Sequence, residues 1–180
     1  MTNTYLALLR GINVGGKNKV TMSELKTYLE ELGYQNVRTY IASGNVLFES
    51  SKSAKELTKE IETLLPKKFK LDSDLIKVLV LSRAQLKAVI DNRPQGFGDQ
   101  PEKYHSDAIF LINVPSSEAI KVFKPREGVD SVWQGDGVIY SQRLSAMRTK
   151  SRLGQMMSSP IYKSMTIRSW STTLKLLDLM

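Results

Sequence analysis

The amino-acid sequence predicts an α+β protein with a ferredoxin-like first half and a smaller, partly similar second half. Two observations predict this fold class. Strand-like and helix-like segments of the first half follow the order β-α-β-β-α-β, which defines ferredoxin-like domains. After a segment rich in proline and glycine, the second half repeats part of that order. With 180 residues, the chain suits one domain or two small, closely packed subdomains with a real hydrophobic core.

Local signals place the elements of the first half. Thr21 and Glu24 have the spacing of a capping box, so a helix is expected to begin there. Gly33 is expected to end that helix, and Pro66 to end the next one. The full expected order is a strand at 5–9, a helix at 21–32, strands at 37–42 and 46–48, a helix at 53–65, a strand at 75–81 and a short helix capped by Ser82.

Residues 92–103, NRPQGFGDQPEK, are the best candidate linker because they carry two prolines and two glycines. The expected domains are therefore a ferredoxin-like subdomain at 1–91 and an α+β subdomain at 104–180, packed as one globule. The second subdomain is expected to contain a strand at 108–114, a helix at 116–123, hairpin strands at 129–133 and 138–140, and helices at 150–158 and 168–179. In the last helix, Arg168 is expected on the face opposite Trp170.

Composition excludes several kinds of site. The chain has no cysteine and a single histidine, His105, so disulfides and thiolate metal sites are excluded and a zinc site is not expected. The surroundings of His105 do not resemble a serine-hydrolase triad. No cofactor is expected. No apolar run approaches the ~20 residues that span a bilayer, and the N-terminus lacks the features of a secretory signal, so we expect a cytoplasmic protein without membrane association.

The formal net charge of +8 is spread unevenly. Residues 1–23 contain three bases and no acid, and residues 137–177 contain seven bases and no acid, whereas the stretch between them is nearly balanced. If the two ends meet in space, they form one positive face that favours an anionic partner. The alternative is a solvated face that serves only solubility.

The loop after the first strand, Gly11–Asn18, is the first candidate site. Gly11, Gly16 and Lys17 have the spacing of a P-loop, but Asn18 stands where serine or threonine would hold Mg²⁺. No aliphatic strand ends in the aspartate that such a site needs. A working ATPase or GTPase is therefore not expected. The open readings are a glycine-rich loop whose amides bind an anion and a turn that only redirects the chain.

Ser43-Gly44-Asn45 is expected to form the turn between the second and third strands. We expect this turn at the end of the sheet opposite the loop that leaves the first strand, so that the two would not share a small pocket. Tyr5, Tyr40 and Phe48 raise the possibility of RNA stacking on the sheet. The RNP1 pattern is absent, and core packing is the expected role of Phe48.

The segment Gln142–Arg152, QRLSAMRTKSR, is the most strongly positive one, and its serine, threonine and glutamine side chains suit phosphate contacts. An exposed loop or helix face without function is the alternative. The complete set of expected anion-binding residues is Arg10, Asn13, Gly15, Gly16, Lys17, Asn18, Lys19, Arg143, Arg148, Lys150, Arg152 and Arg168.

Three blocks carry a family resemblance: LLRGINVGGKNKVTMSEL, VRTYIASGNVLFES and TIRSWSTTLKLL. They resemble the hallmark blocks of a widespread bacterial family known as a domain of unknown function, and the resemblance spans essentially the whole chain. The third block departs from the usual TxRNWNTxxKL, because Ser169 and Ser171 stand where asparagines are common. The resemblance implies an α+β protein with a ferredoxin-like N-terminal part, and it implies no activity.

Three hypotheses for the function follow. The first is a cytoplasmic protein that binds an anionic partner, either nucleic acid or a phosphorylated metabolite, on its basic surface. The second is an enzyme in which the glycine loop stabilises negative charge and Glu24, Asp107 or Asp136 acts as base. The third is a protein-interaction module. The sequence ranks the first hypothesis highest.

Overall fold

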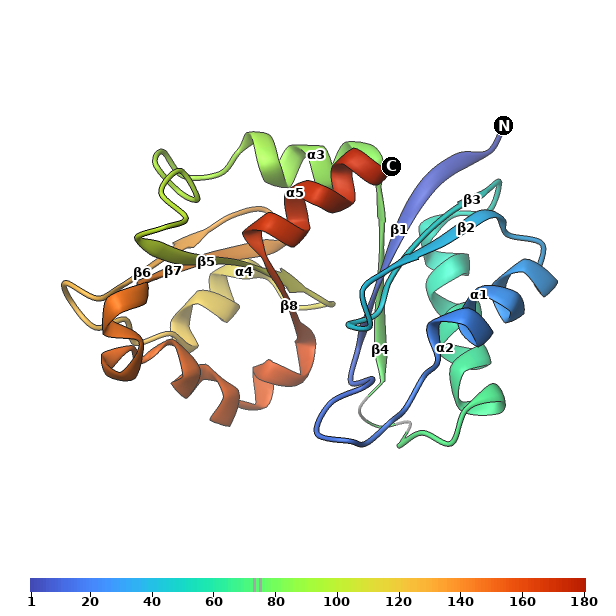
Figure 1. The fold of residues 1–180 in the computed structure, drawn as a ribbon, viewed down its shortest axis with the longest axis horizontal. Coiled ribbons are helices and arrows are strands. Elements are labelled where there is room, and N and C mark those ends of the chain that lie inside the picture. The colour runs from blue at the N-terminus through green and yellow to red at the C-terminus, as the bar shows by residue number, and fades with distance from the viewer. Residues whose placement is uncertain (73, 75) are drawn as a thin grey trace. The chain divides into compact units, whose positions relative to one another are not determined.

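The computed structural model describes residues 1–72, 74 and 76–180. The chain divides into two compact units (Figure 1). The first comprises Met1–Leu86 and Leu176–Met180, and the second comprises Lys87–Lys175. The first-unit elements are β1 (Asn3–Arg10), α1 (Met22–Glu31), β2 (Gln35–Tyr40), β3 (Asn45–Ser50), α2 (Ala54–Lys68) and β4 (Lys77–Ser82). These are followed by α3 (Arg83–Asp91), β5 (Tyr104–Leu111), α4 (Ser116–Ala119), the 3₁₀ turn η2 (Ile120–Val122), β6 (Asp130–Gln134) and β7 (Val138–Leu144). The last elements are the 3₁₀ turns η3 (Ser145–Lys150), η4 (Leu153–Ser158) and η5 (Pro160–Ser164), then β8 (Met165–Ser169) and α5 (Trp170–Leu179).

The sheet of the first unit has the strand order β2-β3-β1-β4, and all its neighbouring strands are antiparallel. With α1 after β1 and α2 after β3, the unit has the predicted order β-α-β-β-α-β, and the predicted α+β fold class is confirmed. Leu75, the first residue of the strand expected at 75–81, lies outside the described residues. None of the helices in the described part of the chain is both long and apolar enough to cross a membrane.

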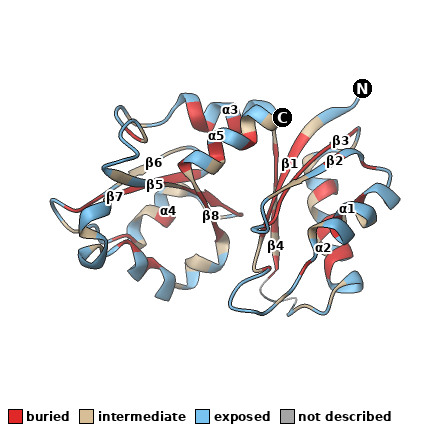
Figure 2. Cartoon of the chain, in the orientation of Figure 1, coloured by how far each residue is buried: buried red, intermediate tan, exposed pale blue. Residues whose placement is uncertain are grey.

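Alternation along β1 builds the core of the first unit. Tyr5, Ala7 and Leu9 are buried in one hydrophobic cluster together with Leu25 and Leu29 of α1 and with apolar side chains of α2. Both helices lie on the same side of the sheet (Figure 1), and their buried positions face it (Figure 2). Burial of each such leucine contributes about 1.5–3 kcal/mol to the free energy of unfolding.

The helix ends differ in part from the predictions. Thr21 is the N-cap residue of α1, but its side chain makes no capping hydrogen bond, so the predicted capping box is not formed. A full capping box begins α2 instead, between Ser53 and Glu56. Pro66 does not end α2, which continues to Lys68. Because Pro66 lies only two residues before the end of α2, its missing N–H removes only one hydrogen bond of the helix.

The second unit repeats the topology of the first. Its strand order is β6-β7-β5-β8, all antiparallel, so β5 to β8 occupy the places of β1 to β4. The short helix α4 takes the position of α1 in chain order, but the three 3₁₀ turns η3, η4 and η5 replace α2 and the helix expected at 150–158. Gly154 and Pro160 disfavour a longer helix in this segment.

The segment 92–103, expected to be a linker, lies inside the second unit. Phe97 is 1% exposed and makes edge-to-face contacts with Trp133, Tyr140 and Trp170. Gly98 packs so closely against Trp170 that a Cβ added there would lie 2.3 Å from the indole ring. The prolines and glycines of this segment therefore shape a packed turn.

Substitution of two nearby glycines tests this packing. Gly96 and Gly98 have similar positive φ angles, +80° and +78°, but only the Cβ of an alanine at 98 would collide with Trp170. Both variants, Gly96→Ala and Gly98→Ala, bear the same backbone strain. We expect Gly98→Ala to lower the free energy of unfolding by about 1–3 kcal/mol more than Gly96→Ala, measured by urea denaturation, because overpacking costs that much. Equal losses would show that residues 92–103 do not pack as described.

Candidate functional site

The loop after β1 ends in a two-residue turn that is exposed to solvent. Lys17 donates its backbone N–H to the carbonyl of Val14 (3.0 Å), and the two residues form an isolated β-bridge. Between them, Gly15 and Gly16 have φ angles of +56° and +75°. Turns of type I′ need positive φ at both central residues, which glycine adopts without strain. The two glycines of GINVGGKN are therefore the apex of a small hairpin.

Asn13 braces the base of this hairpin. Its side-chain amide donates to the carbonyls of Val20 (3.0 Å) and Ala42 (2.9 Å), and its side-chain oxygen accepts from the backbone N–H of Val20 (2.8 Å). Asn13 itself has a φ of +52°, a conformation that asparagine tolerates better than most residues. One side chain thus joins the two ends of the loop to each other and to the turn between β2 and β3.

Asn18 braces the other side of the hairpin. Its amide donates to the carbonyl of Gly11 (2.8 Å), and its side-chain oxygen accepts from the backbone N–H of Asp72 (2.9 Å). The backbone N–H of Asn13 also donates to the carbonyl of Asn18 (2.9 Å). Asn13 and Asn18, both expected to contact an anion, therefore use their side-chain amides within the protein.

The turn expected at Ser43-Gly44-Asn45 lies at the same end of the sheet as this loop, and the expectation of opposite ends was wrong. Since β3 is antiparallel to both β1 and β2, those two strands run in the same direction and end together. The backbone N–H of Leu9 donates to the carbonyl of Gly44 (2.8 Å). A Cβ at Gly44 would lie 2.8 Å from the Cβ of Leu9, so only glycine fits there.

These hydrogen bonds join three segments into one group of loops, here called the loop cluster. It consists of residues 11–20, residues 41–44 and Asp72. Val14, Gly15, Gly16, Lys17 and Lys19 are exposed on it. Among the described residues, the amide N–H groups of Gly15 and Gly16 donate to no acceptor, and Lys17 and Lys19 form no ion pair with a carboxylate. The cluster thus presents free hydrogen-bond donors and positive charge to solvent.

This geometry differs from that of a P-loop. In a P-loop, the helix starts directly after the glycines, so that its N-terminus faces the phosphates. Here α1 starts at Met22, five residues after Lys17, and the backbone N–H of Lys17 is occupied by Val14. The hairpin therefore lacks the strand–loop–helix arrangement of a P-loop.

Basic side chains of the 142–152 segment lie in the second unit. Arg143 is half-buried in β7, which continues four residues beyond the predicted strand, whereas Arg148, Lys150 and Arg152 are exposed in or beside η3. Arg10, Lys17 and Lys19 belong to the first unit. The pooling of the two ends into one face stays a prediction.

The buried carboxylate of Asp130 fixes the end of the 142–152 segment. Asp130 is 8% exposed, and its Oδ2 accepts from the backbone N–H groups of Arg126 (2.9 Å) and Arg152 (2.8 Å). Burial acts to raise the pKa of Asp130, but these hydrogen bonds and the nearby Arg143 outweigh it and lower the pKa below its ordinary value. Two arginines distant in sequence are thereby fixed as neighbours.

Arg168 does not lie on the exposed helix face where it was expected. It is the penultimate residue of β8, is 6% exposed, and donates to the hydroxyl of Thr166 and the carbonyl of Ile167 (both 2.9 Å). Burial lowers its pKa to about 10. The helix α5 begins only at Trp170, which is buried, and Leu174 in the same helix is 41% exposed.

Of the three acids considered as possible bases, Asp107 has the most distinctive setting. Its carboxylate lies 3.1 Å from Nε2 of His105, and burial raises its pKa although His105 and Arg143 act in the opposite direction. Asp107 belongs to the second unit, whereas the glycine loop belongs to the first. Glu24 and Asp136 are exposed.

From the sequence alone, Asp130 is not identified as a structural residue, and Asn13 is assigned to anion binding and not to the support of the loop. The partners of Asp130 are backbone amides 4 and 22 residues away, and no motif announces such contacts. Asn13 lies in a recognisable loop, and asparagine is one of the few residues other than glycine that tolerates a left-handed conformation. That preference was the available signal for a structural role.

Residues 1–140 match the family described as "Protein of unknown function (DUF1697)". The chain belongs to this family. All three segments of the loop cluster lie within the matched residues. The chain is also similar to a solved structure, described as the conserved bacterial protein SP0830 from Streptococcus pneumoniae, with 26% sequence identity, 99% of each chain covered and a TM-score of 0.81. No curated protein matches the chain.

The brace at Asn13 predicts a stability effect that can be separated from backbone strain. Asn13 and Asn36 have nearly equal φ angles, +52° and +50°, so Asn36→Ala is a matched control. We expect Asn13→Ala to lower the free energy of unfolding by about 1–3 kcal/mol more than Asn36→Ala, because the variant loses three hydrogen bonds. Chemical denaturation monitored by far-UV circular dichroism measures this difference, and equal losses would contradict the brace.

The lowered pKa of Asp130 predicts a pH dependence of stability. Its folded-state pKa lies below the unfolded value of about 3.9. The stabilisation is therefore fully present well above about pH 4 and is lost as the pH falls through the folded pKa. In urea denaturation from about pH 7 to pH 3, we expect the wild type to lose stability more steeply than Asp130→Asn. Asp136→Asn, at an exposed position, is expected to follow the wild-type slope.

Proposed function

We propose that this protein binds an anionic partner through the loop cluster, and that the partner is the sugar-phosphate backbone of a nucleic acid. The observation that carries the proposal is the braced hairpin with two unused glycine amides at its apex and Lys17 and Lys19 beside them. Phosphate oxygens accept hydrogen bonds from amide N–H groups and from lysine side chains. Because Asn13 and Asn18 fix the loop, little conformational entropy is lost when a ligand binds.

The exposure of the apex favours a polymer over a small metabolite. A Cβ placed on Gly15 or Gly16 would meet nothing within 4 Å, and Val14 is 66% exposed. A ligand there is contacted from one side only. Small-molecule sites usually enclose about 70–90% of their ligand, whereas a nucleic-acid backbone is commonly held along a single face.

The loop amides and lysines predict a salt-dependent affinity. We expect a fluorescently labelled single-stranded oligonucleotide to bind at low salt, with log K falling linearly with log salt concentration. The double variant Lys17→Ala/Lys19→Ala is expected to bind more weakly and to reduce the magnitude of that slope by about 1–2. Fluorescence anisotropy measures both quantities.

A lysine elsewhere on the first unit supplies the control. Lys26, on α1, has an exposed side chain with a long ion pair (3.8 Å) to Glu30, so Lys26→Ala removes one positive charge outside the loop cluster, half of what the double variant removes. The proposal fails if no binding occurs at low salt or if Lys26→Ala weakens binding as much as the double variant does. If sugar phosphates raise the melting temperature and oligonucleotides do not, the partner is a phosphorylated metabolite.

A further inference from the structure

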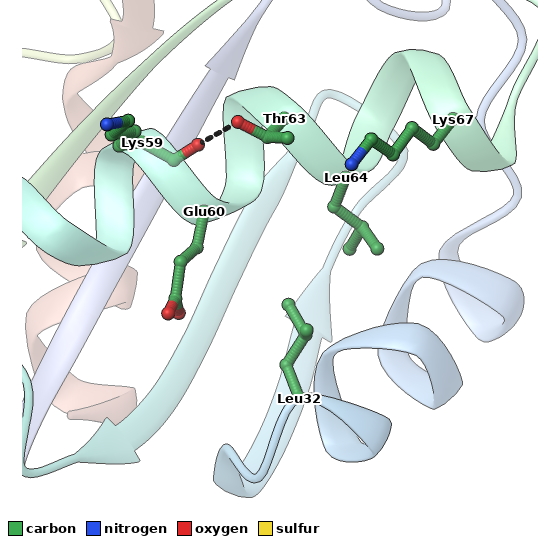
Figure 3. A pocket seen from close by; sticks show the side chains of 6 residues that line it. All are labelled: Leu32, Lys59, Glu60, Thr63, Leu64 and Lys67. Carbon is green, nitrogen blue, oxygen red and sulfur yellow. Dashed lines mark hydrogen bonds between the residues drawn. The ribbon is translucent and has the colours of Figure 1, made fainter.

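A shallow apolar groove lies between the end of α1 and the middle of α2 in the first unit. Leu32, which follows α1, and Leu64 of α2 point toward each other across it (Figure 3). The groove has a volume of about 290 Å³ and is also lined by Lys59, Glu60, Thr63 and Lys67. Leu32 is 38% exposed, which leaves apolar surface open to solvent on an otherwise polar side of the helix pair.

The charges around the groove are unbalanced because the carboxylates of α2 are already engaged within the unit. Glu60 accepts from the Tyr34 hydroxyl (2.9 Å) and pairs with Lys52 (2.6 Å). Glu62 accepts from the backbone N–H of Val78 (3.0 Å), and Glu56 caps its own helix.

In contrast, Lys59 and Lys67 have no carboxylate partner among the residues that the structure describes. The Thr63 hydroxyl donates back to the carbonyl of Lys59 (2.7 Å), so the groove keeps an apolar floor. The two lysines are eight residues apart on α2, or about 12 Å along the helix axis. The surface therefore consists of an apolar centre with one free positive charge on each side.

We propose that this groove docks an acidic amphipathic helix of a partner protein. Apolar side chains of the partner fill the space between Leu32 and Leu64, and two of its carboxylates, about seven or eight residues apart on the partner helix, meet Lys59 and Lys67. Charge complementarity sets the orientation and the rate of association, while apolar burial supplies most of the affinity. The inference concerns a different surface from the loop cluster and does not depend on the proposed function.

An NMR titration of the full chain tests the proposal. The probe is a synthetic helical peptide of about 14 residues, with leucines along one face and two glutamates about seven residues apart. We expect amide shift changes centred on Leu32, Thr63 and Leu64. The double variant Lys59→Glu/Lys67→Glu is expected to weaken binding at least about fivefold, because two attractive pairs become repulsive. A peptide with lysines in place of the two glutamates is expected to regain affinity for that variant.

Two controls separate docking from general attraction between opposite charges. Lys55 is an exposed lysine on α2 outside the groove, so Lys55→Glu is expected to leave the affinity unchanged within about twofold, because no carboxylate of the docked peptide meets that position. A peptide with serines in place of the leucines is expected not to bind. The proposal is overturned if that peptide binds equally well, if Lys55→Glu weakens binding as much as the double variant, or if the shift changes lie elsewhere.

Other occupants would also be recognised by this titration. If decanoate shifts the groove residues and the peptide does not, the site takes a small amphiphile and the proposal is wrong. If dilution of the protein alone shifts the same residues, a second copy of this chain covers the groove, and the proposal is likewise wrong.

Discussion

The side chain of Asn13 is the interaction on which the organisation of the loop cluster depends. It makes hydrogen bonds to Val20 and Ala42 at once, and so connects the loop after β1 to the turn between β2 and β3. Without those bonds, the amide and carbonyl groups at the loop base would face solvent and the hairpin apex would have no fixed direction. Gly15 and Gly16 are held in an exposed position because the side chain of Asn13 makes all its hydrogen bonds within the protein.

Much of the fold was predictable because its signals are local. The continuous apolar run of β1, the leucine spacing in α1 and α2, and turn residues predicted the order β-α-β-β-α-β, and the structure confirms the α+β class. The errors lie where tertiary contacts override local preference. Thr21 and Glu24 have the spacing of a capping box, but the side chain of Thr21 makes no capping hydrogen bond. The segment around Phe97 reads as a linker by composition, yet it packs against three aromatic rings.

The candidate site was less predictable, because its geometry depends on strand direction and on backbone partners. The sequence marked both loops, but it placed them at opposite ends of the sheet; the ladder of β1, β3 and β2 brings them together. Arg168 was expected to be exposed because helical spacing was assumed for a residue that belongs to β8. Asp130 carried no signal, since a carboxylate that binds distant backbone amides leaves no pattern in the sequence.

The two units have the same strand order, but different elements connect their third and fourth strands. In the first, a 15-residue helix with a full capping box covers the sheet. In the second, three separate 3₁₀ turns take its place in the chain, and each is shorter than two turns of an α-helix. Short turns gain little from helical cooperativity. Native-state hydrogen exchange should therefore find residues 145–164 among the first amides to open, well before those of α2.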